Sequence, residues 1–141
     1  MTTRDFSSDE EVQALVDGFE SCGIAAAEFT HAAHIAVGLY YLAEFPPVVA
    51  LSRMRKNIRA FAAHHRADSL YHETITTFWM RLLDHLASAK YVDLPLWQRI
   101  NVIVADWGTR RPVEAHYTPE LISSAAARER WMPPDREPLP F

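Results

Sequence analysis

Cysteine, glycine and long apolar runs are all scarce in this sequence, and their scarcity excludes several classes of protein. A single cysteine, Cys22, rules out a disulfide within the chain and favours a reducing, cytoplasmic setting. We interpret its thiol as a small buried hydrophobe in preference to a nucleophile. No segment approaches the roughly 20 apolar residues of a membrane span, and the polar N-terminus lacks the apolar core of a secretory signal. We therefore expect a cytoplasmic protein without a membrane partner.

Clustered positive charge is also missing. The net charge is −4, and the lysines and arginines are scattered along the chain. No basic stripe of the kind that follows a phosphate backbone is present, so we expect no nucleic-acid partner. The chain has 141 residues, of which 49% are hydrophobic and 23% charged, as is typical of one globular domain with a real core. Nothing in the sequence sets the oligomeric state.

Signals for β-strands are weak, whereas apolar residues recur at helical spacing. Ser7 and Ser8 begin a first helix that reaches about residue 21. The pattern predicts four more helices, over about 30–45 with Thr30 as N-cap, 47–65, 69–89 with Asp68 or Ser69 as N-cap, and 95–108. We expect an all-α, single-domain, up-down bundle of about five helices, followed by short helical turns near residues 118 and 123. The Pro-rich tail over residues 133–141 is expected to be extended, and residues 1–6 flexible.

Four of the seven histidines fall on the apolar faces of these helices: His31, His34, His65 and His72. Short connections make neighbouring helices antiparallel, so the second helix begins at the end of the bundle where the third finishes and the fourth starts. All four histidines are therefore expected at that end. Glu73 belongs to the same end, and the fifth helix returns toward it with His116.

Three of these imidazoles suit a metal ion. His31 and His34 are three residues apart and can face one ion from the same side of a helix, and His72 would supply a third nitrogen. His31 and His72 lie in first helical turns, where the helix dipole favours the neutral imidazole that binds metal. We expect a divalent transition metal, iron or zinc, because this ligand set does not select one metal.

The remaining residues are assigned to chemistry and binding. Glu73 is predicted to act as a fourth ligand or as a base that activates water. His65 lies at a helix C-terminus, which favours the protonated form, and is the predicted proton donor. Tyr71 and His116 are predicted to contact a small-molecule ligand or substrate. These roles describe a metal-dependent enzyme, but the sequence leaves open whether catalysis occurs.

A second interpretation needs no metal. Polar residues gather at helix ends because the ends carry unpaired backbone groups that need hydrogen bonds. The histidines would then form a structural layer that fixes the bundle. The protein would be a non-catalytic helical module that binds a partner or a small ligand.

Three sequence blocks resemble an uncharacterised family of small bacterial helical proteins. The blocks are FTHAAH over residues 29–34, YHETIT over 71–76 and HYTPEL over 116–121. Their order, with an acidic first helix, a cysteine-containing loop and a Pro-rich end, is similar to that family over nearly the whole chain, from about Glu10 to Pro140. The resemblance implies a helical fold and supplies no activity. Its blocks contain His31, His34, His72 and Glu73, whereas His65 lies outside them.

Overall fold

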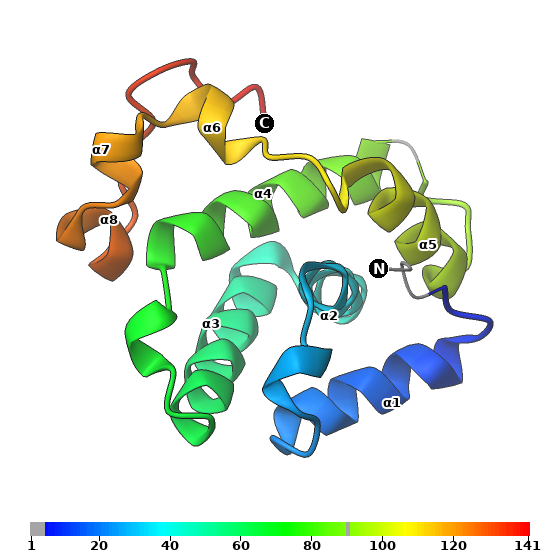
Figure 1. The fold of residues 1–141 in the computed structure, drawn as a ribbon. Coiled ribbons are helices and arrows are strands. Elements are labelled where there is room, and N and C mark those ends of the chain that lie inside the picture. The colour runs from blue at the N-terminus through cyan, green and yellow to red at the C-terminus, as the bar shows by residue number, and fades with distance from the viewer. Residues whose placement is uncertain (1–4, 90) are drawn as a thin grey trace.

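The structure is a computed structural model that describes residues 5–89 and 91–141, and every regular element within them is a helix. The all-α prediction is therefore confirmed (Figure 1). The long helices are α1 (Asp9–Glu20), α2 (His31–Glu44), α3 (Pro47–His64), α4 (Glu73–Ala89) and α5 (Leu96–Trp107). The short ones are η1 (Ala26–Glu28), η2 (Asp68–Leu70), α6 (Val113–His116), α7 (Pro119–Ile122) and α8 (Ala125–Glu129).

Helix α2 lies at the centre of the molecule, and α1, α3, α4 and α5 pack around it (Figure 1). Its buried residues occupy nearly consecutive positions from Ala33 to Tyr41, which is the pattern of a helix covered on all sides. At Gly38 an added Cβ would lie 2.9 Å from Cδ1 of Leu83 and 3.2 Å from the sulfur of Met80. Glycine therefore allows α4 to approach the central helix closely.

Several helices begin or end at residues with a recognisable capping role. The Thr30 hydroxyl accepts a hydrogen bond from the backbone N–H of Ala33 and begins α2, as predicted. Gly108 follows the last residue of α5, next to the predicted end of the fifth helix. The predicted start of the fourth helix is wrong. Residues 68–70 form a separate 3-10 turn, and α4 begins at Glu73. The reason is that the His72 imidazole accepts a hydrogen bond from Ile75 N–H at 3.1 Å and replaces the expected side-chain cap.

The C-terminal segment lies along α4 (Figure 1). The Thr74 hydroxyl is within 2.6 Å of the Ala127 carbonyl and 2.8 Å of the Arg130 carbonyl. The chain after residue 129 contains no helix, in line with the expected tail, and Phe141 packs against Phe78 with ring centroids 5.7 Å apart. These contacts fix the segment on the side of α4 that faces away from α2 and α3.

The N-terminal prediction is only partly covered by the structure. Residues 1–4 lie outside the described residues. Phe6 is buried, and its backbone exchanges two hydrogen bonds with the Asn101 side chain, at 2.9 and 2.8 Å. Cys22 is partly buried against the core. None of the helices formed by the described residues has both the length and the apolar character needed to cross a membrane.

Candidate functional site

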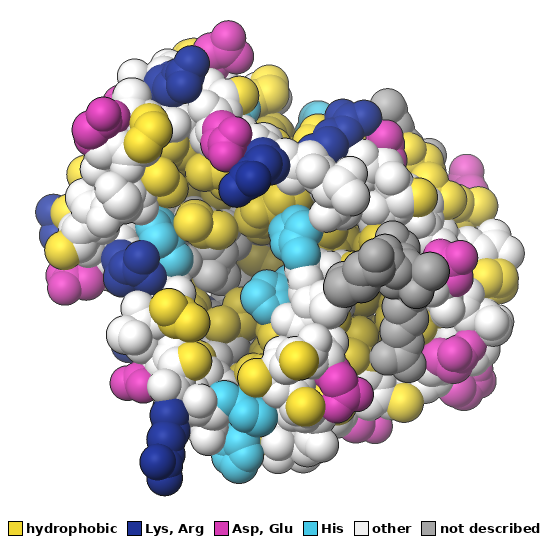
Figure 2. Space-filling model, in the orientation of Figure 1, with side chains coloured by type: hydrophobic (Ala, Val, Ile, Leu, Met, Phe, Trp, Pro, Cys, Tyr) yellow, Lys and Arg dark blue, Asp and Glu magenta, His cyan; other side chains and the backbone are white. Residues whose placement is uncertain are grey.

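An open pocket of about 230 Å³ lies between α2, α3, α4 and the η2 segment. Most of its wall is made of isoleucine, leucine, methionine and tryptophan side chains. Figure 2 shows a hollow on this face, with hydrophobic side chains inside it and histidine side chains beside it. The polar residues that line the pocket are His31, His34, Tyr71, His72 and Thr76. The structure thus brings three of the predicted site histidines to one pocket.

His31 and His34 enter the pocket from the first two turns of α2. His31 is exposed, and its ring meets Trp79 edge-on with centroids 4.6 Å apart. His34 is partly buried, and its ring packs against Phe29 with centroids 4.0 Å apart. Burial lowers the pKa of both imidazoles, and the neighbouring His31 helps to lower that of His34 to about 4. Both rings are therefore neutral at pH 7, and each offers one N–H donor and one acceptor nitrogen.

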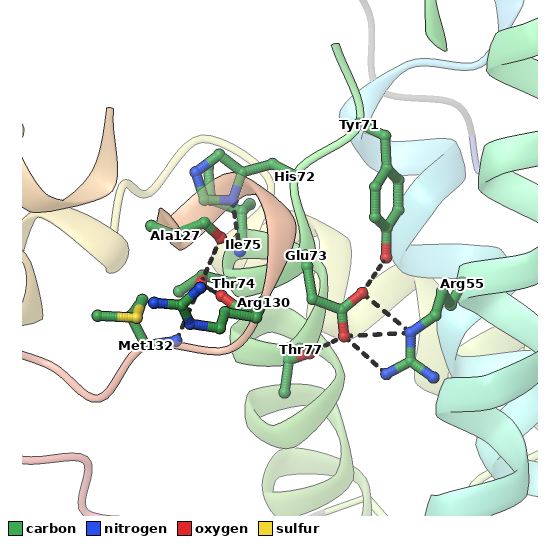
Figure 3. Close-up of polar contacts among 10 residues, drawn as sticks. All are labelled: Arg55, Tyr71, His72, Glu73, Thr74, Ile75, Thr77, Ala127, Arg130 and Met132. Carbon is green, nitrogen blue, oxygen red and sulfur yellow. Dashed lines mark hydrogen bonds and ion pairs between the residues drawn. The ribbon is translucent and has the colours of Figure 1, made fainter. Parts of the chain in front are cut away.

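His72 differs because both of its ring nitrogens are already engaged. Nδ1 accepts the hydrogen bond from Ile75 N–H, so Nε2 carries the proton and donates to the Ile122 carbonyl at 2.6 Å. The ring is buried and points toward the C-terminal segment (Figure 3). It joins the start of α4 to the end of α7. Coordination of a metal by His72 would require one of these two hydrogen bonds to break.

Glu73 points to the opposite side of α4, toward α3 (Figure 3). Its carboxylate accepts hydrogen bonds from Arg55 at 2.7 and 2.9 Å, from the Tyr71 hydroxyl at 2.6 Å and from the Thr77 hydroxyl at 3.3 Å. Burial raises the pKa of Glu73, but these hydrogen bonds outweigh burial and hold the pKa below its ordinary value. The carboxylate is thus ionised, fully partnered and outside the pocket lining. A weakly basic, fully partnered carboxylate is a poor general base.

Tyr71 lines the pocket, as the predicted ligand contact should, while its hydroxyl is committed to Glu73. Burial and that hydrogen bond raise the Tyr71 pKa to about 12, against an opposing contribution from Thr76. The Arg59 guanidinium lies 5.2 Å from the ring centroid. Tyr71 therefore contributes its ring to the pocket wall, while its hydroxyl donates a hydrogen bond to Glu73 outside the pocket.

His65 and His116 are not among the residues that line the pocket. His65 follows the last residue of α3. Its ring packs against those of Phe61 and His64, with centroids 4.5 and 4.9 Å apart. Its Nε2 is buried and has no hydrogen-bond partner within the described part of the chain. The Nδ1 of His116 lies 2.7 Å from the Glu137 carbonyl, so this residue belongs to the C-terminal segment.

Several residues of the site were not recognised from the sequence. Arg55 was not singled out as a site residue in the sequence, yet its guanidinium forms an ion pair with Glu73. Trp79, Met54 and Met80 line the pocket, although helical spacing assigns such residues to a core. Apolar residues recur at the same helical spacing whether they line a pocket or pack in the core, so no sequence signal separates a pocket wall from a packed interior.

Within residues 5–89 and 91–141, no group of three or more His, Cys, Asp or Glu side chains is arranged to hold a metal ion. His31 and His34 share a pocket wall, but His72 and Glu73 are both turned to other partners. The three-histidine metal site remains a prediction.

Comparisons with protein-family models, with curated proteins and with solved structures returned no match. Function is therefore argued from the pocket itself.

Proposed function

We propose that this protein binds a small, mostly apolar organic molecule in the pocket between α2, α3 and α4. The observation that supports this most is the composition of the pocket: apolar walls with a few polar side chains, including His31 and His34. Small-molecule sites are typically concave and apolar, with a few polar groups that fix the orientation of the ligand. A ligand that covers these walls gains about 25 cal/mol per Å² of apolar surface removed from water.

The second supporting observation is that some polar side chains around the pocket are hydrogen-bonded within the protein and others are not. The polar groups of His72 and Tyr71 are bonded to other parts of the protein. His31 and His34 have no ring hydrogen bond to any described residue. Polar atoms without protein partners beside an apolar cavity are available to a ligand. A purely structural histidine layer would instead bond its members to the fold.

The test is a screen of small organic fragments by ligand-observed NMR on the untagged full chain. We expect fragments to bind the wild-type protein and to lose binding in Ile58→Trp, which places an indole in the pocket from α3. The matched control is Val48→Trp, on the same helix at a position that is 81% exposed and outside this pocket. Equal binding by both variants, each folded by circular dichroism, would contradict the proposal.

The shared position of His31 and His34 also supports a second candidate function, in which the two imidazoles bind an iron or zinc ion. They lie one helical turn apart on one wall of the pocket. An ion there would have two protein ligands and would complete its coordination with water or with the bound molecule. Calorimetric titration of zinc or ferrous iron into untagged protein, with His34→Gln as the comparison, tests this function. A wild-type affinity no greater than that of the variant would exclude it.

A further inference from the structure

We propose that the molecule bound in this pocket is an uncharged phenol, with one aromatic ring against Trp79 and the methionines and its hydroxyl bonded to His34. This inference rests on the proposed function, because it names the ligand of the same pocket. It is carried by four features of the site: its volume, the absence of charge from its lining, the chemistry of its walls and the unpartnered imidazoles.

The volume limits the size of the ligand. The pocket measures about 230 Å³. A cavity of about 150 Å³ lined by Leu, Ile and Phe is large enough to bind benzene. The pocket therefore accommodates one six-membered ring with a short substituent. Fused rings and long chains would extend into solvent and leave part of their apolar surface wet.

The lining excludes a charged ligand. Among the described residues that line the pocket there is no lysine, arginine, aspartate or glutamate. Arg55 and Glu73, near the start of α4, lie outside this lining and neutralise each other, with an Arg55 Nη2 to Glu73 oxygen distance of 2.7 Å. An ion moved from water into apolar surroundings loses its hydration, and this is unfavourable unless an opposite charge meets it. A neutral ligand avoids that penalty.

The walls favour an aromatic ring over an aliphatic chain. Trp79 offers its indole, already in edge contact with His31. Met54 and Met80 offer polarisable sulfurs, which make favourable contacts with aromatic rings and adapt to irregular shapes. Aromatic pairs also attract each other beyond the burial of their surface. A rigid ring loses little conformational freedom on binding, in contrast to an alkyl chain of equal size.

The hydroxyl group follows from His34. Within residues 5–89 and 91–141 neither nitrogen of its ring has a hydrogen-bond partner, although the side chain is partly buried and lines the pocket. A neutral imidazole presents one acceptor and one donor. A phenol hydroxyl is a stronger donor than an alcohol, and it can donate to the acceptor nitrogen of His34. Its own oxygen can accept a hydrogen bond, and His31 lies one turn away on the same wall.

The experiment compares three probes of similar size by calorimetry with the wild-type full chain: para-cresol, para-methylanisole and para-toluate. The methyl ether keeps the ring and the oxygen but has no proton to donate, and the toluate carries a negative charge. We expect para-cresol to bind about tenfold more tightly than the ether, the effect of about one neutral hydrogen bond. We expect the toluate to bind least. In His34→Phe, which keeps a ring in that position, para-cresol and the ether should bind equally.

The outcomes separate the two proposals. If the ether binds as tightly as para-cresol to the wild type, and Ile58→Trp abolishes both, the pocket binds small apolar molecules but the assignment to phenols is wrong. If the toluate binds most tightly, the assignment of an uncharged ligand is wrong. If no probe and no fragment binds the wild-type pocket, both proposals fail. The comparison of cresol with ether in the wild type decides the phenol assignment even if His34→Phe does not fold.

Discussion

Histidines of the sequence blocks stand at the starts of both α2 and α4, yet the two helices use them in opposite ways. At α4, His72 bonds through both ring nitrogens and Glu73 accepts from three different side chains. At α2, the hydroxyl of Thr30 supplies the cap, and the imidazoles of His31 and His34 are left to face the pocket. An available cap residue therefore frees the histidines of α2, whereas α4 uses its histidine as the cap. The start of α4 supports the fold, and we infer that the start of α2 meets the ligand.

The sharpest test of this contrast is Glu73→Gln. The variant removes the charge that meets Arg55 and weakens the hydrogen bonds of a side chain that is only 11% exposed. Breaking a buried ion pair typically costs about 3–5 kcal/mol, and the partial exposure of Arg55 places our expectation near 3 kcal/mol. Urea unfolding measures the loss. Glu114→Gln, in the exposed pair with Arg111, is the matched control and should lose less than about 0.5 kcal/mol.

Acid should weaken the fold through His34 before it affects Glu73. The pKa of His34 is lowered from 6.5 to about 4 in the folded chain, so the unfolded chain takes up the proton first as the pH falls. The contribution of the neutral His34 ring to the free energy of unfolding is complete above pH 6.5 and is lost as the pH falls from about 6.5 to 4. Glu73, whose pKa is lowered from 4.5, adds a loss only below that value.

The expected loss from His34 is about 2 kcal/mol, reduced from the full pKa difference because the ring is only partly buried. Urea unfolding of wild type and His34→Gln from pH 7.5 to 4.5 measures it. The variant should show a smaller fall over this range, with the remainder assigned to His31 and other titrating groups. Identical pH profiles would show that His34 is not the desolvated group we describe.

His72→Asn should have a smaller effect. Asparagine is a good N-cap and can replace the bond to the N–H of Ile75, but it does not reach the Ile122 carbonyl as the imidazole does. We expect a loss of about 1 kcal/mol, the value of one neutral hydrogen bond, in thermal unfolding. His72→Ala should lose about twice as much because the cap is removed as well. Equal losses in the two variants would show that the ring nitrogen does not cap α4.

The sequence was sufficient for the five long helices, apart from the start of α4, and for the shared position of three of the four histidines. Apolar periodicity and capping residues such as Thr30 act locally, so they can be read without the fold. His31, His34 and His72 line one pocket, as their expected position at a shared end of the helices predicted. The spacing of apolar residues does not reveal the hydrogen-bond partner of each polar side chain.

The contacts at this site that the sequence did not predict come from partners that are distant in the sequence. Arg55 reaches Glu73 across 18 positions, and the Ile122 carbonyl reaches His72 across 50. Neighbours in sequence also separate, because the side chains of His72 and Glu73 leave α4 on opposite sides (Figure 3). The metal ligand role of His72 and the catalytic roles of Glu73 and His65 remain predictions that the contacts of these residues do not favour.

The last prediction separates the two helix starts by their response to metal. If His31 and His34 bind zinc, then His34→Gln should lower the zinc affinity at least tenfold, because glutamine does not replace an imidazole ligand. The stabilisation by added zinc should fall in the same variant, since a ligand stabilises the fold only through its binding. His72→Asn should change the zinc affinity by less than about twofold, because both ring nitrogens of His72 already bond to the protein. Calorimetry measures the affinity and thermal unfolding measures the stabilisation. A tenfold loss of zinc affinity in His72→Asn would show that His72 is a metal ligand and that the ion displaces one of its hydrogen bonds. The contrast between the starts of α2 and α4 would then be wrong.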